Sequence, residues 1–320
     1  MPILALLLLS MLPFAAAGAA EPAAHGELDE VWVVGSRPGP RLWKVSRGDH
    51  VLWLLGTPEL LPARMQWDSA SVDAALIQSQ LLITGPRVSI KGGPIVLFRL
   101  YRQWRGLQRT NEKATLNVTL PAPLHARFEA LRQRDAPRER GWEKLRPMVA
   151  ADRLFDAAID RVGLKRGGSV RAEVGRIAAK RGVKVQRVEL QLEQPELLLR
   201  ELAATLDAAE VRCMEATVAR VETDLPDSAR RAAAWARGDL AGIRALAYPD
   251  NRAACAEAVA TSTPRVRQLL ARSQELWLQA VDAALTAHVS SVAMRPVQDL
   301  LRPDGVLQAL ERRGYRVEEP

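Results

Sequence analysis

The sequence predicts an α/β fold, with a mixed, largely parallel sheet and a large helical insertion in the middle of the chain. Residues 51–80 and 288–313 each contain an apolar run, a loop and a helix-like stretch. A strand followed by a helix and another strand is typical of a βαβ unit, and therefore of a parallel sheet. Between these segments, residues from about 120 to 286 carry apolar side chains at three- and four-residue spacing, as helices do. With 320 residues, 48% of them hydrophobic, the chain can bury a large core.

The first predicted element is a β-hairpin over residues 41–55. The runs "LWKVS" and "HVLWLLG" are strand-like, and the turn "RGD" separates them. A helix is predicted over residues 69–80, with Asp68 or Ser69 as its N-cap. It leads into a short apolar strand, residues 81–84, which we expect a Gly-Pro pair to end.

The rest of the chain is predicted to be helical except for three strands. Residues 120–180 are mostly helical, and the long helical stretch 194–286 should break near Pro226, at 236–239 and around 248–251. The strands are expected at 183–190, at 288–294 and at the C-terminus, with a helix over 304–314 before the last one. In open α/β sheets ligands lie beyond the carboxyl ends of strands, so the loops around Glu59 and Asp299 are the first candidates for a site.

Residues 1–20 are predicted to be a signal peptide. An apolar run ends in the small residues Ala17-Gly18-Ala19, which fits a cleavage site, although no Lys or Arg precedes it. The alternative is an uncleaved membrane anchor, but the run is shorter than a spanning helix needs and contains Pro13. Cleavage would leave a lead, residues 21–40, and a domain, residues 41–320, with no transmembrane segment. We therefore expect an exported protein, periplasmic or secreted, in a Gram-negative bacterium.

The formal net charge is +8. Nucleic acid is a poor partner for an exported protein, whereas anionic glycans, lipid headgroups or acidic proteins fit the charge better. The alternative is a general arginine bias, because the basic residues are spread along the chain.

Two cysteines, Cys213 and Cys255, are present. In an oxidising compartment an even count predicts one disulfide bond, and two buried thiols are the alternative. No CxxC pair, HExxH helix, GxSxG elbow, Walker loop or GxGxxG loop occurs, and the four histidines have no metal-ligand spacing.

Several segments together resemble the TraB/GumN family, which is related to the Tiki metalloprotease domain. They are "LWKVSRGDHVLWLLGTPELLP", "WDSASVDAALIQSQLLI", the stretch from "KLRPMVAADRL" to "VELQLEQ" with Glu189 and Gln194, "RAAAWARGDLAGIRAL", "LLARSQELWLQAVDAAL" and "LLRPDGVLQALERRGYRVE". The resemblance covers about residues 41–318.

The resemblance implies two Gly-x-x-His loops, a carboxylate and an arginine around a divalent metal used for hydrolysis. In the first loop, "GTPE", the histidine position holds Glu59, and in the second, "PVQD", it holds Asp299, with Pro296 in place of the glycine. The acidic position falls at about Gly85, so this carboxylate is missing, while the arginine is present as Arg272.

Three interpretations follow. We favour a pseudoenzyme that keeps the fold, needs no cofactor and retains a binding role in the cell envelope, because the histidines and the carboxylate that would hold zinc are replaced. The first alternative is an active, peptidase-like hydrolase in which Glu59 and Asp299 hold a harder divalent metal or act as acid and base, with Arg272 beside them. The second is a basic factor that binds an anionic envelope glycan or protein.

Overall fold

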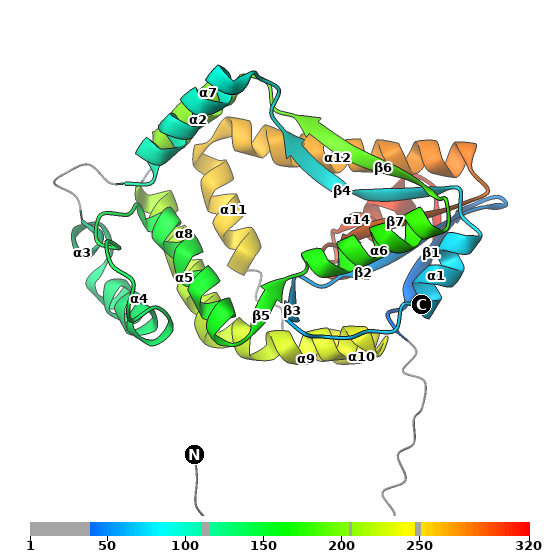
Figure 1. The fold of residues 1–320 in the computed structure, drawn as a ribbon, viewed down its shortest axis with the longest axis horizontal. Coiled ribbons are helices and arrows are strands. Elements are labelled where there is room, and N and C mark those ends of the chain that lie inside the picture. Colours follow the sequence, from blue (N-terminus) through cyan, green and yellow to red (C-terminus); the bar gives the residue numbers. More distant parts are fainter. Residues whose placement is uncertain (1–38, 110–114, 205–206, 247–250) are drawn as a thin grey trace, which may run out of the picture. The chain divides into compact units, whose positions relative to one another are not determined.

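The computed structural model describes residues 39–109, 115–204, 207–246 and 251–320 (Figure 1). The predicted signal peptide and nearly all of the lead lie outside the described residues. The predicted α/β architecture is confirmed, and the described helices and strands belong to one compact unit within residues 37–320. Within the described residues, no helix combines the length and the apolar character needed to cross a bilayer.

The main sheet has six strands in the order β6-β4-β7-β2-β1-β8. Strands β6, β4, β7 and β2 are parallel to one another, whereas β1 is antiparallel to both β2 and β8. The strands of this sheet are β1 (Leu42–Arg47), β2 (His50–Thr57), β4 (Leu81–Ser89), β6 (Lys184–Gln191), β7 (Ser290–Pro296) and β8 (Arg316–Glu318). The predicted N-terminal hairpin is therefore confirmed as β1–β2. A separate two-stranded sheet pairs β3 (Leu60–Pro62) with β5 (Leu164–Arg166), and neither strand was expected.

Strands β2 and β7 are parallel neighbours. Their register pairs Gly56 with Arg295 and Thr57 with Pro296, so both strands end at the same level of the sheet. The loop that carries Glu59 and the helix that carries Asp299 therefore leave the same edge of the sheet. Asp299 was expected in a loop, but it lies in the short helix that directly follows β7.

Strand β4 is longer than predicted. It continues through Gly85 and Pro86 to Ser89, with an irregularity in its register between Thr84 and Arg87. A proline lacks the N–H that a sheet needs, and it is tolerated in strands at bulges and edges. Both conditions hold here, because β4 pairs with β7 only as far as Ile83 and with β6 alone beyond it.

Helices cover both faces of the main sheet and form a separate core in the insertion. In chain order, the first seven helices are α1 (Ala70–Ile77), α2 (Pro94–Leu107), α3 (Leu116–Thr119), α4 (Ala122–Asp135), α5 (Pro147–Arg161), α6 (Gly168–Lys180) and α7 (Pro195–Ala203). The others are α8 (Asp207–Ala219), the π-helix η1 (Arg220–Asp224), α9 (Leu225–Ala236), α10 (Leu240–Ala245), α11 (Asn251–Ser262), α12 (Pro264–Ala287), α13 (Val297–Leu301) and α14 (Val306–Arg312).

Alternation along β2 shows the two faces. Leu54 packs into the core formed with α12 and α14, and the next residue, Leu55, packs into the core formed with α1 and α6. The insertion has its own core around Phe128, Trp142 and Leu154, and Leu60 of β3 belongs to it. The loop that carries Glu59 therefore lies where the sheet meets the insertion.

The predicted break near Pro226 is wrong. Helix α8, η1 and α9 follow one another without interruption, and Pro226 is the second residue of α9. A proline is tolerated in the first turn of a helix, and the wider π-turn of η1 directly precedes it. The break at 236–239 is confirmed between α9 and α10, whereas the one around 248–251 falls largely outside the described residues.

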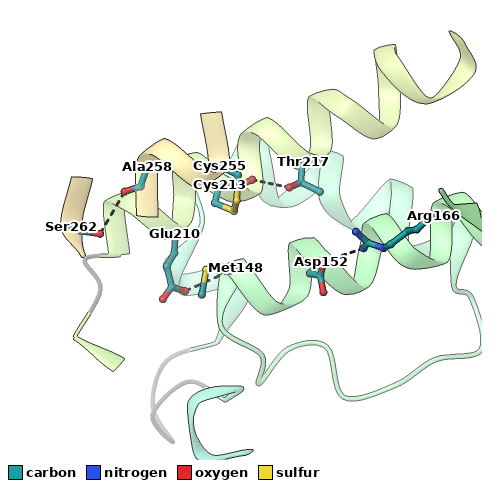
Figure 2. The surroundings of a disulfide bond; sticks show 9 residues. All are labelled: Met148, Asp152, Arg166, Glu210, Cys213, Thr217, Cys255, Ala258 and Ser262. Atoms are coloured by element: carbon teal, nitrogen blue, oxygen red, sulfur yellow. Dashed lines mark hydrogen bonds and ion pairs between the residues drawn. A yellow bond between two sulfur atoms is a disulfide. The ribbon is translucent and has the colours of Figure 1, made fainter. Parts of the chain in front are cut away.

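The predicted disulfide is confirmed. Figure 2 shows Cys213 of α8 bonded to Cys255 of α11. The Thr217 hydroxyl donates a hydrogen bond to the Cys213 carbonyl oxygen at 2.9 Å, one turn along α8. The bond therefore fastens α11, which precedes the long helix α12, to the core helix of the insertion.

Candidate functional site

The end of β2 is held in place by contacts from three directions. The indole N–H of Trp235 donates to the Gly56 carbonyl oxygen at 2.6 Å, and the Thr57 hydroxyl donates to the Arg295 carbonyl oxygen at 3.2 Å. A Cβ at Gly56 would lie 3.1 Å from side-chain atoms of Trp43 and Val297, so the position has little room for a side chain. The loop that follows therefore starts from a fixed point.

A second glycine supports the loop from the side of the insertion. The N–H of Gly167, at the start of α6, donates to the Glu59 carbonyl oxygen at 2.6 Å. A Cβ on Gly167 would lie 2.1 Å from the Pro58 carbonyl oxygen, which is a clash with backbone. The backbone of Glu59 is thus fixed by β2 on one side and by the β5–α6 turn on the other.

The Glu59 side chain forms an ion pair that is largely shielded from solvent. Its Oε2 accepts from the Arg220 guanidinium at 2.6 Å and from the Gln298 amide at 3.2 Å. The side chains of Arg220 and Glu59 are only 10% and 14% exposed. Arg220 is the first residue of η1, so the irregular helical segment presents the partner of Glu59. π-Helical turns occur frequently at functional sites.

The ion pair continues into a chain of alternating charges. The Nε of Arg220 lies 3.6 Å from an oxygen of Asp224, and the Arg231 guanidinium pairs with the other oxygen of Asp224. Arg231 also donates to the Asp224 carbonyl oxygen at 2.9 Å and to the Ser228 hydroxyl at 3.0 Å. Glu59, Arg220, Asp224 and Arg231 are hereafter called the charge chain.

Burial raises the pKa of Asp224 above its ordinary value. The nearby guanidinium groups of Arg231 and Arg220 oppose this change, and the negative charge of Glu59 adds to it. Asp224 is 5% exposed, so the desolvation of its carboxylate is substantial. The raised pKa of Asp224 thus reflects its burial, in spite of the two guanidinium groups beside it.

Arg220 is also fixed by an aromatic ring. Its guanidinium carbon lies 4.0 Å from the centroid of the Phe155 ring, and that of Arg166 lies 5.4 Å from the same centroid. Cation–π contacts of this kind favour a fixed orientation of the guanidinium group.

A small pocket opens at the charge chain. Pro58, Glu59, Leu60, Arg220, Asp224, Ser228, Arg231, Ala232 and Gln298 line it. Its charged lining consists of two carboxylates and two guanidinium groups, which balance each other. A pocket of this kind offers no net negative potential to a cation.

Comparison with known proteins gave one match. The family model described as "TraB/PrgY/gumN family" matches residues 41–319. The chain belongs to the TraB/PrgY/gumN family. Neither the curated proteins nor the solved structures that were searched contain a match to the chain. The resemblance predicted from the sequence is therefore confirmed at the level of the family.

The family-like segment "WARGD" has a structural explanation. Trp235 supplies the indole that fixes the end of β2. Gly238 has a φ of +67°, and a Cβ there would lie 2.7 Å from the Gly39 carbonyl oxygen. Asp239 caps α10, since its carboxylate accepts from the N–H of Gly242 at 2.7 Å. Trp235 thus supports the strand end from which the Glu59 loop leaves, and Gly238 and Asp239 shape the turn into α10.

The four positions inferred from the family resemblance do not all reach the pocket. Glu59 lines it, but on α13 the neighbour Gln298, and not Asp299, contacts Glu59. Asp299 pairs with Arg295 at 3.0 Å, one turn earlier. Arg272 is exposed on α12 and is not part of the described pocket lining. Gly85 lies inside β4.

The sequence reasoning missed Arg220, Asp224 and Arg231. In the sequence they are spaced by four and seven residues, so a helix places them on one face. That pattern could have predicted the mutual pairs, but not that Arg220 points to Glu59, which lies 161 residues earlier in the chain.

Proposed function

We propose that this protein is a non-catalytic member of the TraB/PrgY/gumN family with a binding role in the cell envelope. The observation that carries the proposal is the ion pair between Glu59, at the first histidine position, and Arg220. Because the Glu59 carboxylate accepts hydrogen bonds from a guanidinium group and from an amide, it stabilises the fold.

The described side chains do not fit a divalent cation. A cation at Glu59 would lie beside the guanidinium groups of Arg220 and, across Asp224, of Arg231, and like charges at this distance repel strongly in a partly buried site. Hard divalent ions require several oxygen ligands, whereas borderline ions favour imidazole and thiolate. Among the described residues, no group of three or more His, Cys, Asp or Glu side chains has a geometry that could hold a metal.

The second loop supports the same conclusion. Adjacent residues of a helix point about 100° apart, so α13 cannot direct both Gln298 and Asp299 at Glu59. The Asp299 carboxylate is paired with Arg295, whose guanidinium lies 5.0 Å from the centroid of the Trp277 ring. The two carboxylates at the former histidine positions are therefore each neutralised by an arginine of their own.

Calorimetric titration of the chain with Zn²⁺, Mn²⁺, Mg²⁺ and Ca²⁺ tests the proposal. The wild type is compared with Glu59→Ala/Asp299→Ala and with Arg220→Gln. We expect no binding to the wild type or to the double variant. Micromolar or tighter binding to the wild type that the double variant loses would overturn the proposal in favour of a metal-dependent hydrolase, and would call for a screen of peptide and ester substrates. Arg220→Gln is the informative control, because gain of binding in this variant alone would identify the guanidinium as the group that keeps a cation out.

Export and periplasmic location are part of the proposal and rest on the N-terminal sequence. Cell fractionation with N-terminal sequencing of the isolated protein tests them, and the expected first residue is Glu21. An intact Met1 in a cytosolic fraction would contradict them.

A further inference from the structure

The strongest feature outside the pocket is the surface of α2. Of the large apolar side chains that are exposed among the described residues, more than half lie between residues 88 and 104: Val88, Ile90, Ile95, Leu97, Phe98, Tyr101 and Trp104. All exposed aromatic side chains of the described residues are in this group. Monomeric soluble proteins rarely expose apolar side chains in such a cluster without a function for them.

Helix α2 uses only one side for packing within the protein. Leu100 is its only buried residue, Val96 and Leu107 are half-buried, and the helix packs against α7. Figure 1 shows α2 and α7 side by side beyond the carboxyl ends of β4 and β6. At about 100° per residue, Leu97, Phe98, Tyr101 and Trp104 lie within roughly one third of the helix circumference, next to the packed side. They form an apolar strip that no other described element covers. Arg105 projects into the same sector of the helix, and its guanidinium carbon lies 5.9 Å from the centroid of the Tyr101 ring.

The same segment carries most of the surplus positive charge of the protein. Between Asp73 and Glu112 the chain has six basic residues and no acidic one, that is +6, and the whole chain has 45 − 37 = +8. The six are Arg87, Lys91, Arg99, Arg102, Arg105 and Arg109, and all of them are exposed. Most arginines elsewhere pair with carboxylates, such as Arg176 with Glu173 and Arg181 with Asp73. Of the acidic residues on α7, Glu201 pairs with Arg265.

We propose that α2 binds the surface of a membrane that contains anionic lipids. The combination of an apolar strip with Trp, Tyr and Phe, a basic flank and no acidic residue is what allows a helix to lie in the interface plane. Trp and Tyr favour the depth of the headgroups, and arginines are attracted to anionic lipid. This inference is independent of the state of the Glu59 pocket.

The charge distribution distinguishes this occupant from a second copy of the chain. A two-fold contact through α2 would bring two identical basic segments together, with no carboxylate on either helix to compensate. An anionic bilayer supplies the compensating charge and also accepts the apolar strip.

Co-sedimentation with vesicles tests the proposal. The chain from Glu21 is used, which leaves out the apolar first residues and keeps the whole described body. Vesicles of equal parts phosphatidylglycerol and phosphatidylethanolamine are compared with vesicles of phosphatidylcholine alone. We expect binding to the anionic vesicles that weakens as the salt concentration rises, and much weaker binding to the neutral ones.

Two sets of variants separate charge from apolar insertion. Arg99→Gln/Arg102→Gln/Arg105→Gln should lower the affinity about fivefold per arginine, on the order of 100-fold together. The matched control, Arg176→Gln/Arg230→Gln/Arg316→Gln, removes the same charge from exposed positions on α6, α9 and β8 and should bind within about twofold of the wild type. Phe98→Ser/Trp104→Ser should lower the affinity by on the order of tenfold or more, whereas Leu270→Ser/Val289→Ser, also at exposed sites, should not.

Three outcomes would overturn the proposal. The first is no preference for anionic vesicles. The second is an equal loss in the control triple variant, which would mean that only the net charge matters. The third is a concentration-dependent dimer in sedimentation velocity that the α2 variants abolish, without vesicle binding, which would assign the strip to a second copy. Circular dichroism and thermal unfolding of each variant establish that all are folded.

Discussion

Removal of the Glu59 carboxylate shows whether Glu59 stabilises the fold through its ion pair with Arg220 or is kept to bind a ligand. In the Glu59→Ala variant, Arg220 keeps its place between Phe155 and Asp224 but loses its closest partner. At 2.6 Å, a pair of unit charges interacts by about 6 kcal/mol at an effective dielectric constant of about 20. The desolvation of both groups offsets part of this gain.

The expected loss of stability is about 3 kcal/mol. Breaking a buried pair by removing one partner costs about 3–5 kcal/mol, because the remaining charge stays buried and uncompensated. The lower end applies here, since Asp224 remains 3.6 Å from the Arg220 guanidinium. A residue kept for ligand binding gives the opposite expectation, because functional positions are often neutral or stabilising when they are removed.

Urea unfolding of a double-mutant cycle measures the effect. The cycle consists of the wild type, Glu59→Ala, Arg220→Met and the double variant, and Glu173→Ala at the exposed Glu173–Arg176 pair is the matched control, with an expected cost within about 1 kcal/mol. The double variant should recover much of the loss, because the isolated buried charge is gone, with a coupling energy of at least about 1 kcal/mol. An unchanged or raised stability of Glu59→Ala, with no coupling to Arg220, would refute the stabilising role.

Three further outcomes are expected. Cys213→Ser/Cys255→Ser should lower the free energy of unfolding by about 4 kcal/mol under the chain-entropy model, given the separation of 42 residues. The reduced wild type should then be as unstable as the variant, and a variant that is still less stable than the reduced wild type would contradict the assignment of the loss to the disulfide bond. The pKa of Asp224 is raised in the folded state, so the stability that its proton contributes is full below the unfolded pKa and is lost as the pH rises through the folded pKa. Asp224→Asn should therefore flatten the decline in the free energy of unfolding from about pH 4 upward. Urea unfolding at a series of pH values measures this, and the same pH dependence in the variant and the wild type would contradict the prediction. Gly167→Ala should lower the free energy of unfolding by about 1–3 kcal/mol, since its Cβ would clash with the Pro58 carbonyl oxygen. A midpoint of thermal unfolding equal to that of the wild type would contradict this, because it would mean that the turn shifts without loss of stability.

Much of the fold could be predicted because local patterns determine it. Apolar runs predicted β2 and β7, and the strand-helix-strand order of residues 51–84 predicted a parallel sheet. That β7 lies between β2 and β4 in this sheet was not predicted. Strand β4 was predicted too short, because the Gly-Pro pair was interpreted as an end and the bulge that accommodates it depends on its neighbour β6. Pro226 misled for a similar reason, since the π-turn before it keeps the helix continuous.

The site was less predictable because its contacts join distant parts of the chain. Comparison with the family pattern pointed to Glu59, which follows β2, but it could not show which residue of α13 faces it. One helical position separates Gln298 from Asp299, and only the packing of the neighbouring buried residues Val297 and Leu300 determines the rotation of α13. The basic and apolar surface of α2 was overlooked for a different reason: the charge was judged by its spread over the whole chain, whereas the absence of acidic residues in one segment is what concentrates it.

The presence of a carboxylate at position 59 and the presence of Arg220 explain each other. Arg220 is 8% exposed, and a guanidinium group remains charged when buried, so it requires a carboxylate nearby. Asp224 cannot serve alone, because it also pairs with Arg231. A neutral imidazole at position 59 would leave the pocket with two guanidinium groups and one carboxylate, which is unfavourable for the fold and repels a cation. A histidine introduced at this position, as the family resemblance implies, would therefore not create a metal site while Arg220 remains. The Glu59–Arg220 pair is best regarded as one structural unit.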